Sequence, residues 1–185
     1  DGIYTYTVIG SPPCSNGIAT VNIVVNQQPE AGTNGNVTVC DDDASFLLFN
    51  LLNGAPDGSG SWTAPGAIPH SGTFIPGVNV PGIYTYTVLG TAPCTDATAT
   101  VSVAVNNAPD AGNNASILVC SDDPSFALYG ILGGTPDLGG TWTDPSNDIH
   151  SGTYIPGSDP SGIYTYLVVG VSPCSNDIAT VLVNE

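Results

Sequence analysis

Hydrophobic and polar residues alternate strictly in the two most regular stretches of the chain. In residues 82–90 (GIYTYTVLG), Tyr84, Tyr86 and Val88 fall on one face of an extended strand and the threonines between them fall on the other. Residues 97–105 (ATATVSVAV) place alanine and valine on one face and threonine and serine on the other. Each stretch is therefore predicted to be a β-strand with one face against a hydrophobic core.

Shorter segments before these two carry the same signal. Residues 36–40 (NVTVC), the segment around Trp62 and residues 71–77 (SGTFIPG) predict short strands, whereas residues 45–54 (SFLLFNLLNG) fit either a strand or a helical turn. Six or seven short strands at roughly ten-residue spacing are typical of a β-sandwich. The fold class predicted from the pattern is all-β, an antiparallel sandwich of the immunoglobulin-like type.

The whole pattern recurs with a period of 80 residues. The two tryptophans (Trp62 and Trp142) and the two histidines (His70 and His150) keep this spacing, as do the cysteines. An alignment of residues 28–105 with 108–185 needs no gap and gives 39 identities in 78 positions. The chain is therefore predicted to consist of tandem repeats.

Two Pro-, Asn- and Gly-containing segments, 26–32 (NQQPEAG) and 106–112 (NNAPDAG), are predicted linkers. They divide the chain into one repeat at 28–107 and a second, nearly complete repeat at 108–185. Residues 1–27 match only the end of a repeat, and a lone hairpin is marginally stable in water. We therefore expect 1–27 to be the C-terminal part of a preceding repeat in a longer array.

Composition restricts the possible partners. The chain has no lysine or arginine and 16 acidic residues, for a formal net charge of −16. Nucleic-acid binding depends on cationic side chains that neutralise phosphates, and anionic membranes repel such a chain, so neither partner is expected. No apolar run approaches the roughly 20 residues that span a bilayer. Cations are the small partners that this charge favours.

The five cysteines lie in no metal-binding spacing, which favours disulfides and an oxidising compartment. One regular pattern joins Cys40 to Cys94 and Cys120 to Cys174 within repeats, with Cys14 paired outside this segment. The other joins Cys14 to Cys40 and Cys94 to Cys120 across the linkers. Cys94 precedes the last strand, about 30 Å from the next repeat in an extended array, and a disulfide needs a Cα separation under about 7 Å. Pairing within repeats is therefore preferred.

Clustered carboxylates follow the first cysteine of each repeat, as CDDDAS in one and CSDDPS in the other. Because Ca²⁺ binds six to eight oxygen ligands, Asp42, Asp43, Asp122 and Asp123 form a candidate calcium site. The spacing is not that of an EF-hand. The alternative is a solvated turn in which these side chains cap the backbone.

The remaining polar and aromatic candidates predict structural roles. His70 and His150 lie in identical HSGT segments, but no nucleophile motif accompanies them, so no catalytic residue and no enzymatic activity are predicted. Trp62 and Trp142 are predicted core residues, with carbohydrate stacking as the alternative. Asp57 and Asp137 are predicted turn formers.

Four segments carry a resemblance to a known family: Val-Cys at 119–120, GGTWT at 139–143, GIYTY at 162–166 and Pro-Cys at 173–174. With their counterparts along the whole chain, they resemble the tandem immunoglobulin-like repeats of giant Bacteroidota surface adhesins, including the gliding-motility type. This resemblance implies type IX secretion, display on the bacterial cell surface and a stalk or filament role. It implies no catalytic residues.

The expected function is that of a structural segment in an extracellular adhesin, whose partners are neighbouring repeats or filament subunits. Two alternatives remain: a module that binds surface polysaccharide, and a non-catalytic appendage of a secreted enzyme.

Overall fold

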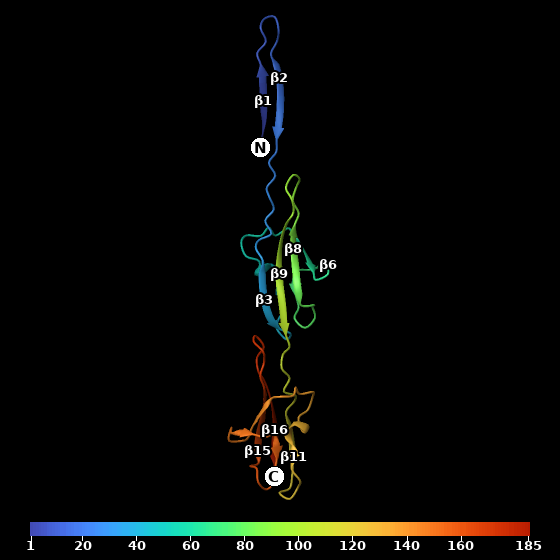
Figure 1. The fold of residues 1–185 in the computed structure, drawn as a ribbon, viewed down its shortest axis with the longest axis vertical. Helices are drawn as coiled ribbons and strands as arrows, with labels where there is room; N and C mark the ends of the chain where they lie inside the picture. The colour runs from blue at the N-terminus through green and yellow to red at the C-terminus, as the bar shows by residue number, and fades with distance from the viewer.

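The computed structural model describes residues 1–185 as an extended string of three parts (Figure 1). A two-stranded hairpin lies at one end, and two seven-stranded repeats, each with a five-stranded and a two-stranded sheet, follow it end to end. The strands of the hairpin are β1 (Gly2–Val8) and β2 (Gly17–Ile23). Those of the first repeat are β3 (Gly35–Cys40), β4 (Phe46–Leu47), β5 (Ser61–Ala64), β6 (Ile68–His70), β7 (Thr73–Phe74), β8 (Gly82–Val88) and β9 (Ala97–Asn106). Those of the second are β10 (Ala115–Leu118), β11 (Phe126–Ala127), β12 (Thr141–Thr143), β13 (Ile149–His150), β14 (Thr153–Tyr154), β15 (Gly162–Val168) and β16 (Asp177–Asn184).

Both repeats have the same topology. The main sheet of the first has the order β3-β9-β8-β5-β6, and β4 and β7 form a separate two-stranded sheet. A 3₁₀ turn follows β4 at Leu48–Leu51. Residues 45–54, which fitted either a strand or a helical turn, therefore contain both. The predicted all-β fold is confirmed. One strand pair in each repeat differs from the predicted antiparallel pairing. β3 runs parallel to β9, with Cys40 opposite Asn106, and β10 runs parallel to β16.

Each repeat has its own hydrophobic core, formed by residues 31–103 in the first and 111–183 in the second. The apolar faces predicted from the alternation are the buried ones, since Tyr84 and Tyr86 are only 1% and 2% exposed. The Tyr84 hydroxyl donates a hydrogen bond of 2.7 Å to the Val80 carbonyl, four residues upstream. Tyr164 does the same with Pro160 at 2.8 Å. This local closure matches the tyrosine corner of immunoglobulin-like domains.

The β1–β2 hairpin repeats the geometry of β8–β9 without a covering layer. Its register joins Tyr4 to Val21 and Tyr6 to Ala19, as β8 and β9 join Tyr84 to Val101 and Tyr86 to Ala99. Tyr4 and Tyr6 are nevertheless 62% and 71% exposed. The hairpin therefore presents to solvent the same apolar face that both repeats bury. None of the helical segments has the length and apolar character needed to cross a bilayer.

Candidate functional site at the repeat junction

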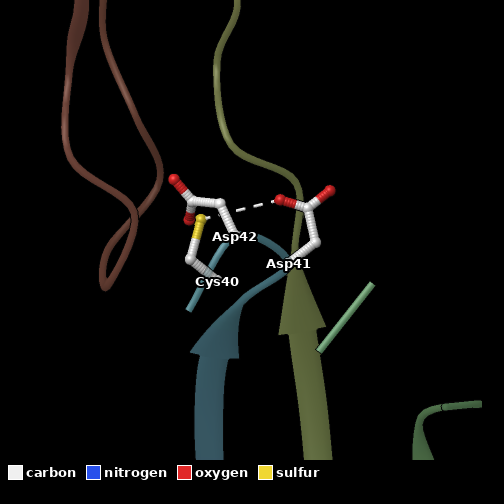
Figure 2. A group of neighbouring side chains, drawn as sticks. All are labelled: Cys40, Asp41 and Asp42. Carbon is white, nitrogen blue, oxygen red and sulfur yellow. Dashed lines mark hydrogen bonds between the residues drawn. The ribbon is translucent and has the colours of Figure 1, made fainter. Parts of the chain in front are cut away.

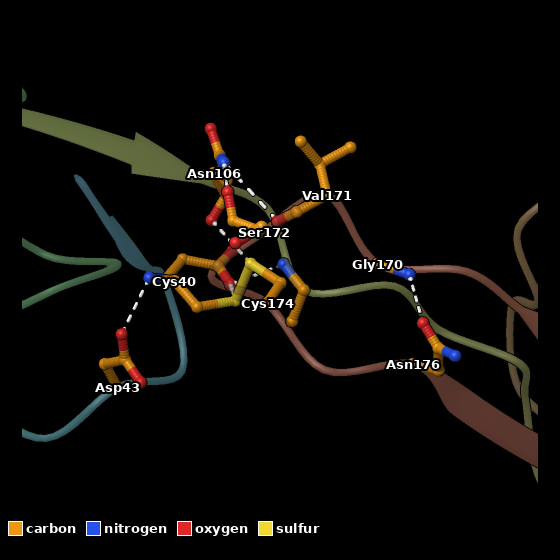
Figure 3. Close-up of a disulfide and its surroundings, with 10 residues drawn as sticks. Cys40, Asp43, Asn106, Gly170, Val171, Ser172, Cys174 and Asn176 are labelled. Atoms are coloured by element: carbon orange, nitrogen blue, oxygen red, sulfur yellow. Dashed lines mark hydrogen bonds between the residues drawn. A yellow bond between two sulfur atoms is a disulfide. The ribbon is translucent and has the colours of Figure 1, made fainter.

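A disulfide joins the two repeats across their linker (Figure 3). Cys40, the last residue of β3, bonds to Cys174, which lies in the turn between β15 and β16. Their Cα atoms are 5.0 Å apart although the residues are 134 positions apart in the chain. The bond connects the downstream end of the first repeat to a hairpin tip of the second.

The predicted pairing of Cys40 with Cys94, and of Cys120 with Cys174, is wrong in this structure. Cys14, Cys94 and Cys120 are unpaired, so the alternative pairs across the linkers are not formed either. Because β3 is parallel to β9, Cys40 lies beside Asn106 at one end of the repeat, whereas Cys94 precedes β9 at the other end. The error lay in placing Cys40 near Cys94. A partner for Cys14 outside this segment stays a prediction.

The tip of the β15–β16 hairpin reaches Cys40 because it is a compact turn that projects back along the linker (Figure 1). Within the turn, the Cys174 amide donates to the Val171 carbonyl at 3.0 Å and the Gly170 amide donates to Asn176 Oδ1 at 3.0 Å. The side-chain amide of Asn106 then donates to the Ser172 carbonyl at 2.8 Å (Figure 3). These bonds hold the tip against the end of β9.

The acidic turn after Cys40 forms the other side of the junction (Figure 2). Asp43 Oδ2 accepts a hydrogen bond of 2.8 Å from the Cys40 amide, and the Asp43 amide donates to the Cys40 carbonyl at 3.2 Å. Asp41 Oδ1 accepts a bond of 2.8 Å from the Ala108 amide of the linker. Asp43 therefore closes the turn, and Asp41 attaches the linker to the first repeat.

The calcium ligands predicted from sequence divide between two roles. Cys40, Asp41 and Asp42 place ligand atoms within 4.8 Å of one another, but the Cys40 sulfur is in the disulfide, so the two carboxylates supply the only oxygens of this group. Asp123 closes its turn as Asp43 does, accepting 2.8 Å from the Cys120 amide. Asp42 and Asp122 are exposed carboxylates. Carboxylate oxygens suit Ca²⁺, and calcium binding stays a prediction.

The histidines and tryptophans lie away from the junction and support the fold. His70 Nδ1 accepts 3.1 Å from the Gly72 amide, and its ring lies 4.9 Å from that of Tyr84. Trp62 and Trp142 are only 8% and 6% exposed and each contacts a core tyrosine at a centroid distance of 5.0 Å. The predicted core role of the tryptophans is confirmed, and their rings offer no open face for carbohydrate stacking.

Tyr154 and Glu185 form a polar pair at the far end of the second repeat. The Tyr154 hydroxyl donates to Glu185 Oε2 at 2.7 Å, and Glu185 Oε1 accepts 2.9 Å from the Gly157 amide. Burial raises the pKa of Tyr154 well above its ordinary value, and the bond to Glu185 raises it further. Burial, followed by the charge of Asp159, raises the pKa of Tyr164 to about 12. Both phenols therefore stay neutral at a pH at which an exposed tyrosine ionises.

No protein-family model matches the chain, and no curated protein matches it as a relative. Among solved structures, the three titin immunoglobulin domains I67–I69 (an E-to-A mutated variant) superpose with a TM-score of 0.57 at 15% identity. That match covers 99% of this chain and 74% of the titin chain. The fold is immunoglobulin-like. At this identity the likeness concerns the fold alone.

Two further matches are weaker. Immunoglobulin domains 1–4 of Sidekick-1 give a TM-score of 0.43 at 13% identity, covering 100% of this chain and 58% of that one. Murine CEACAM1b gives 0.35 at 14% identity, covering 82% and 98%.

Proposed function

We propose that this chain is a spacer segment of an extracellular bacterial surface adhesin, in which immunoglobulin-like repeats are fixed end to end as a stalk. The observation that carries the proposal is the disulfide between Cys40 and Cys174, which spans a repeat boundary. A bond inside one repeat would stabilise that repeat alone. A bond across the linker restricts how two repeats move relative to each other, which is what a stiff stalk requires.

Three contacts act together at this junction. Besides the disulfide, the Asn106 side chain binds the hairpin tip and Asp41 binds the linker amide of Ala108. The junction between the hairpin and the first repeat has the corresponding amide contact, because Asn26 Nδ2 donates to the Ala92 carbonyl at 2.6 Å. The asparagine contact with a hairpin tip therefore occurs at both junctions, whereas the disulfide is present at one.

The extracellular setting rests on two features. Disulfides persist in oxidising compartments and are rare in the cytosol. The absence of lysine and arginine leaves trypsin-like proteases without a cleavage site, which suits exposure outside the cell. The adhesin class rests on the likeness of the repeat motifs to Bacteroidota surface proteins.

Small-angle X-ray scattering tests the stalk role. We compare the oxidised protein with a Cys40→Ser/Cys174→Ser variant, and we use Cys14→Ser/Cys120→Ser as the matched control because both of its cysteines are exposed and unpaired. The wild type and the control are expected to scatter as stiff rods. The variant lacking the bridge is expected to show a broader distribution of interatomic distances, because the linker regains freedom. Identical scattering of all three proteins would contradict the proposed role.

A further inference from the structure

Cys94 lies in the same setting as the bonded Cys174, although it is unpaired. Its amide donates to the Thr91 carbonyl at 3.0 Å, and the Gly90 amide donates to Asp96 Oδ1 at 2.9 Å, which reproduces the turn around Cys174. The Cys94 sulfur lies 3.5 Å from the Asn26 carbonyl oxygen, as the Cys174 sulfur lies 3.5 Å from that of Asn106. The first repeat therefore positions a hairpin-tip thiol at its upstream junction.

Cys120 lies in the same setting as the bonded Cys40. Its turn is closed by Asp123 at 2.8 Å as the turn of Cys40 is closed by Asp43 at 2.8 Å, and the Asp123 amide donates back to the Cys120 carbonyl at 3.0 Å. The Val119 amide donates to the Asn184 carbonyl at 3.0 Å, which keeps Cys120 beside the end of the last strand. This end of the second repeat thus presents a thiol outward.

The single pocket of the molecule lies at this end. It has a volume of about 680 Å³ and is lined by residues 119–121, 157–161 and Glu185. The counterparts of Cys120 and Ser121 in the first repeat are Cys40 and Asp41, which are the residues that contact the second repeat through the disulfide and the Ala108 amide. The counterparts of 157–161 stay largely exposed in the first repeat, so the hairpin tip and linker cover only the cysteine side of the corresponding surface. That side is buried at Cys40, which is 2% exposed, and open at Cys120.

We propose that the pocket around Cys120 is a receptor for the hairpin tip of a further repeat of the same kind, whose turn cysteine bonds to Cys120. By the same rule, Cys94 bonds to the first-strand cysteine of a preceding repeat. Each junction of the array then carries one disulfide. This inference rests on the proposed function and extends it from one observed junction to all of them.

The bond forms by thiol–disulfide exchange. Two protein thiols are oxidised to one protein disulfide while one molecule of a small disulfide, such as oxidised glutathione, is reduced to two thiols. The two electrons and two protons pass to the small disulfide, so the step needs no other reactant. A repeat attached by a linker of a few residues presents its cysteine at a high effective concentration, which favours this partner over a separate molecule.

The test is a disulfide map of an extended protein in which a second copy of residues 106–185 follows Glu185, so that the 80-residue period is kept. The protein is folded with oxidised and reduced glutathione, free thiols are blocked with N-ethylmaleimide, and the fragments are identified by mass spectrometry. Chymotrypsin is used to cut the chain, because a chain without lysine or arginine has no trypsin site. The expected bonds are Cys40–Cys174 and a bond from Cys120 to the appended counterpart of Cys174. Cys14, Cys94 and the appended counterpart of Cys120 are expected to carry the label.

The matched control is Cys120→Ser in the same extended protein. It should keep Cys40–Cys174 and add the label to the appended hairpin tip, which shows that the chain folds without the new bond. Three results would overturn the inference: labelling of Cys120 in the unmutated protein, a Cys120–Cys174 bond within the repeat, or a dimer joined through Cys14 of a second copy. Labelling of Cys120 or a dimer through Cys14 would leave the Cys40–Cys174 bond in place, so this inference can fail while the proposed function stands. A Cys120–Cys174 bond would use the partner of Cys40 and would count against both.

Discussion

Gly72 packs against the indole of Trp62 and has a backbone conformation that suits glycine. Its φ is +85°, and a Cβ atom at this position would lie 2.7 Å from Trp62 Cδ1. Gly66 has a similar φ of +82° but open space around it, and Gly58 has open space without a positive φ. These three glycines separate the steric cost of a side chain from its conformational cost.

Alanine substitution at the three positions should give a graded loss of stability. Gly72→Ala should lower the free energy of unfolding by about 2–4 kcal/mol, because overpacking adds to the left-handed strain. Gly66→Ala should cost about 1–2 kcal/mol from strain alone, and Gly58→Ala should stay within about 0.5 kcal/mol. Denaturant unfolding measured by tryptophan fluorescence distinguishes them. Equal losses at positions 66 and 72 would show that the contact with Trp62 carries no weight.

The buried tyrosines predict a loss of stability at alkaline pH. Burial raises the pKa of Tyr84, Tyr154 and Tyr164 above the ordinary value of 10.0. In the unfolded chain these phenols ionise near pH 10, whereas in the folded chain they stay neutral to higher pH. Their contribution is therefore fully present below pH 10 and is lost as pH rises from there toward the folded pKa, which for Tyr164 is about 12.

The free energy of unfolding should be flat between about pH 7 and 9 and should fall above pH 10, by at most about 1.4 kcal/mol per pH unit for each tyrosine. Tyr154→Phe should reduce the slope. Phenylalanine occupies the equivalent position, Phe74, in the first repeat, so the fold accepts it. Tyr4→Phe, on the exposed hairpin, is the control that should leave the slope unchanged. A slope insensitive to Tyr154→Phe would contradict the assignment.

At the scale of single residues, the sequence allowed the burial of Tyr84 and Tyr86 to be predicted, because strict alternation assigns each side chain to a face. The core role of the tryptophans was also predicted, from their place in a short strand of each repeat. The partner of Cys40 could not be predicted in the same way. An 80-residue period is equally compatible with bonds between Cys40 and Cys94 or between Cys40 and Cys174, since both recur in every repeat. Only the direction of β3 relative to β9 decides between them, and strand composition carries no such information.

Among the elements, the acidic turn after the first strand of each repeat contains the carboxylates predicted to bind Ca²⁺. Asp43 and Asp123 accept backbone hydrogen bonds that close their turns. Asp42 and Asp122 are therefore the carboxylates that can be removed without opening the turn. If Ca²⁺ binds here, millimolar Ca²⁺ should raise the melting temperature relative to EDTA by several degrees, and Asp42→Asn/Asp122→Asn should abolish the difference. Asp57→Asn, at a separate turn, should retain it. Equal melting curves of the wild type in Ca²⁺ and EDTA would reject the site.

The hairpin tips are elements whose shape does not depend on the bond they make. The turn at Cys14 has the same closure as the others, with the Cys14 amide donating to the Ser11 carbonyl at 2.8 Å. This turn is preformed in all three copies and bonded in one. The Pro-Cys pair within a predicted loop was visible in the sequence, but its projection over the linker depends on packing between Asn106 and the tip.

For the molecule as a whole, the exposed face of the β1–β2 hairpin is the main apolar surface without a partner. Tyr4, Tyr6 and Val8 occupy the positions that Tyr84, Tyr86 and Val88 bury. A dye that binds exposed apolar surface, such as ANS, should fluoresce with this protein, and Tyr4→Thr/Tyr6→Thr should lower that signal several-fold. Thr5→Ala/Thr7→Ala, on the opposite face, is the control. Dye binding that survives the tyrosine substitutions would place the apolar surface elsewhere.

The bridge between Cys40 and Cys174 also determines how the chain bears tension. When the two repeats are pulled apart along their axis, the shortest covalent route starts at the upstream linker (26–32) and runs through β3 to Cys40. It then crosses to Cys174 and continues through β16. Residues 41–173 lie off this route, so unfolding them releases no length. The route contains about 25 residues, most of them already extended in β3 and β16, and therefore has little slack. Two small, marginally stable domains thus form a nearly inextensible link, whose strength is that of covalent bonds rather than of folding.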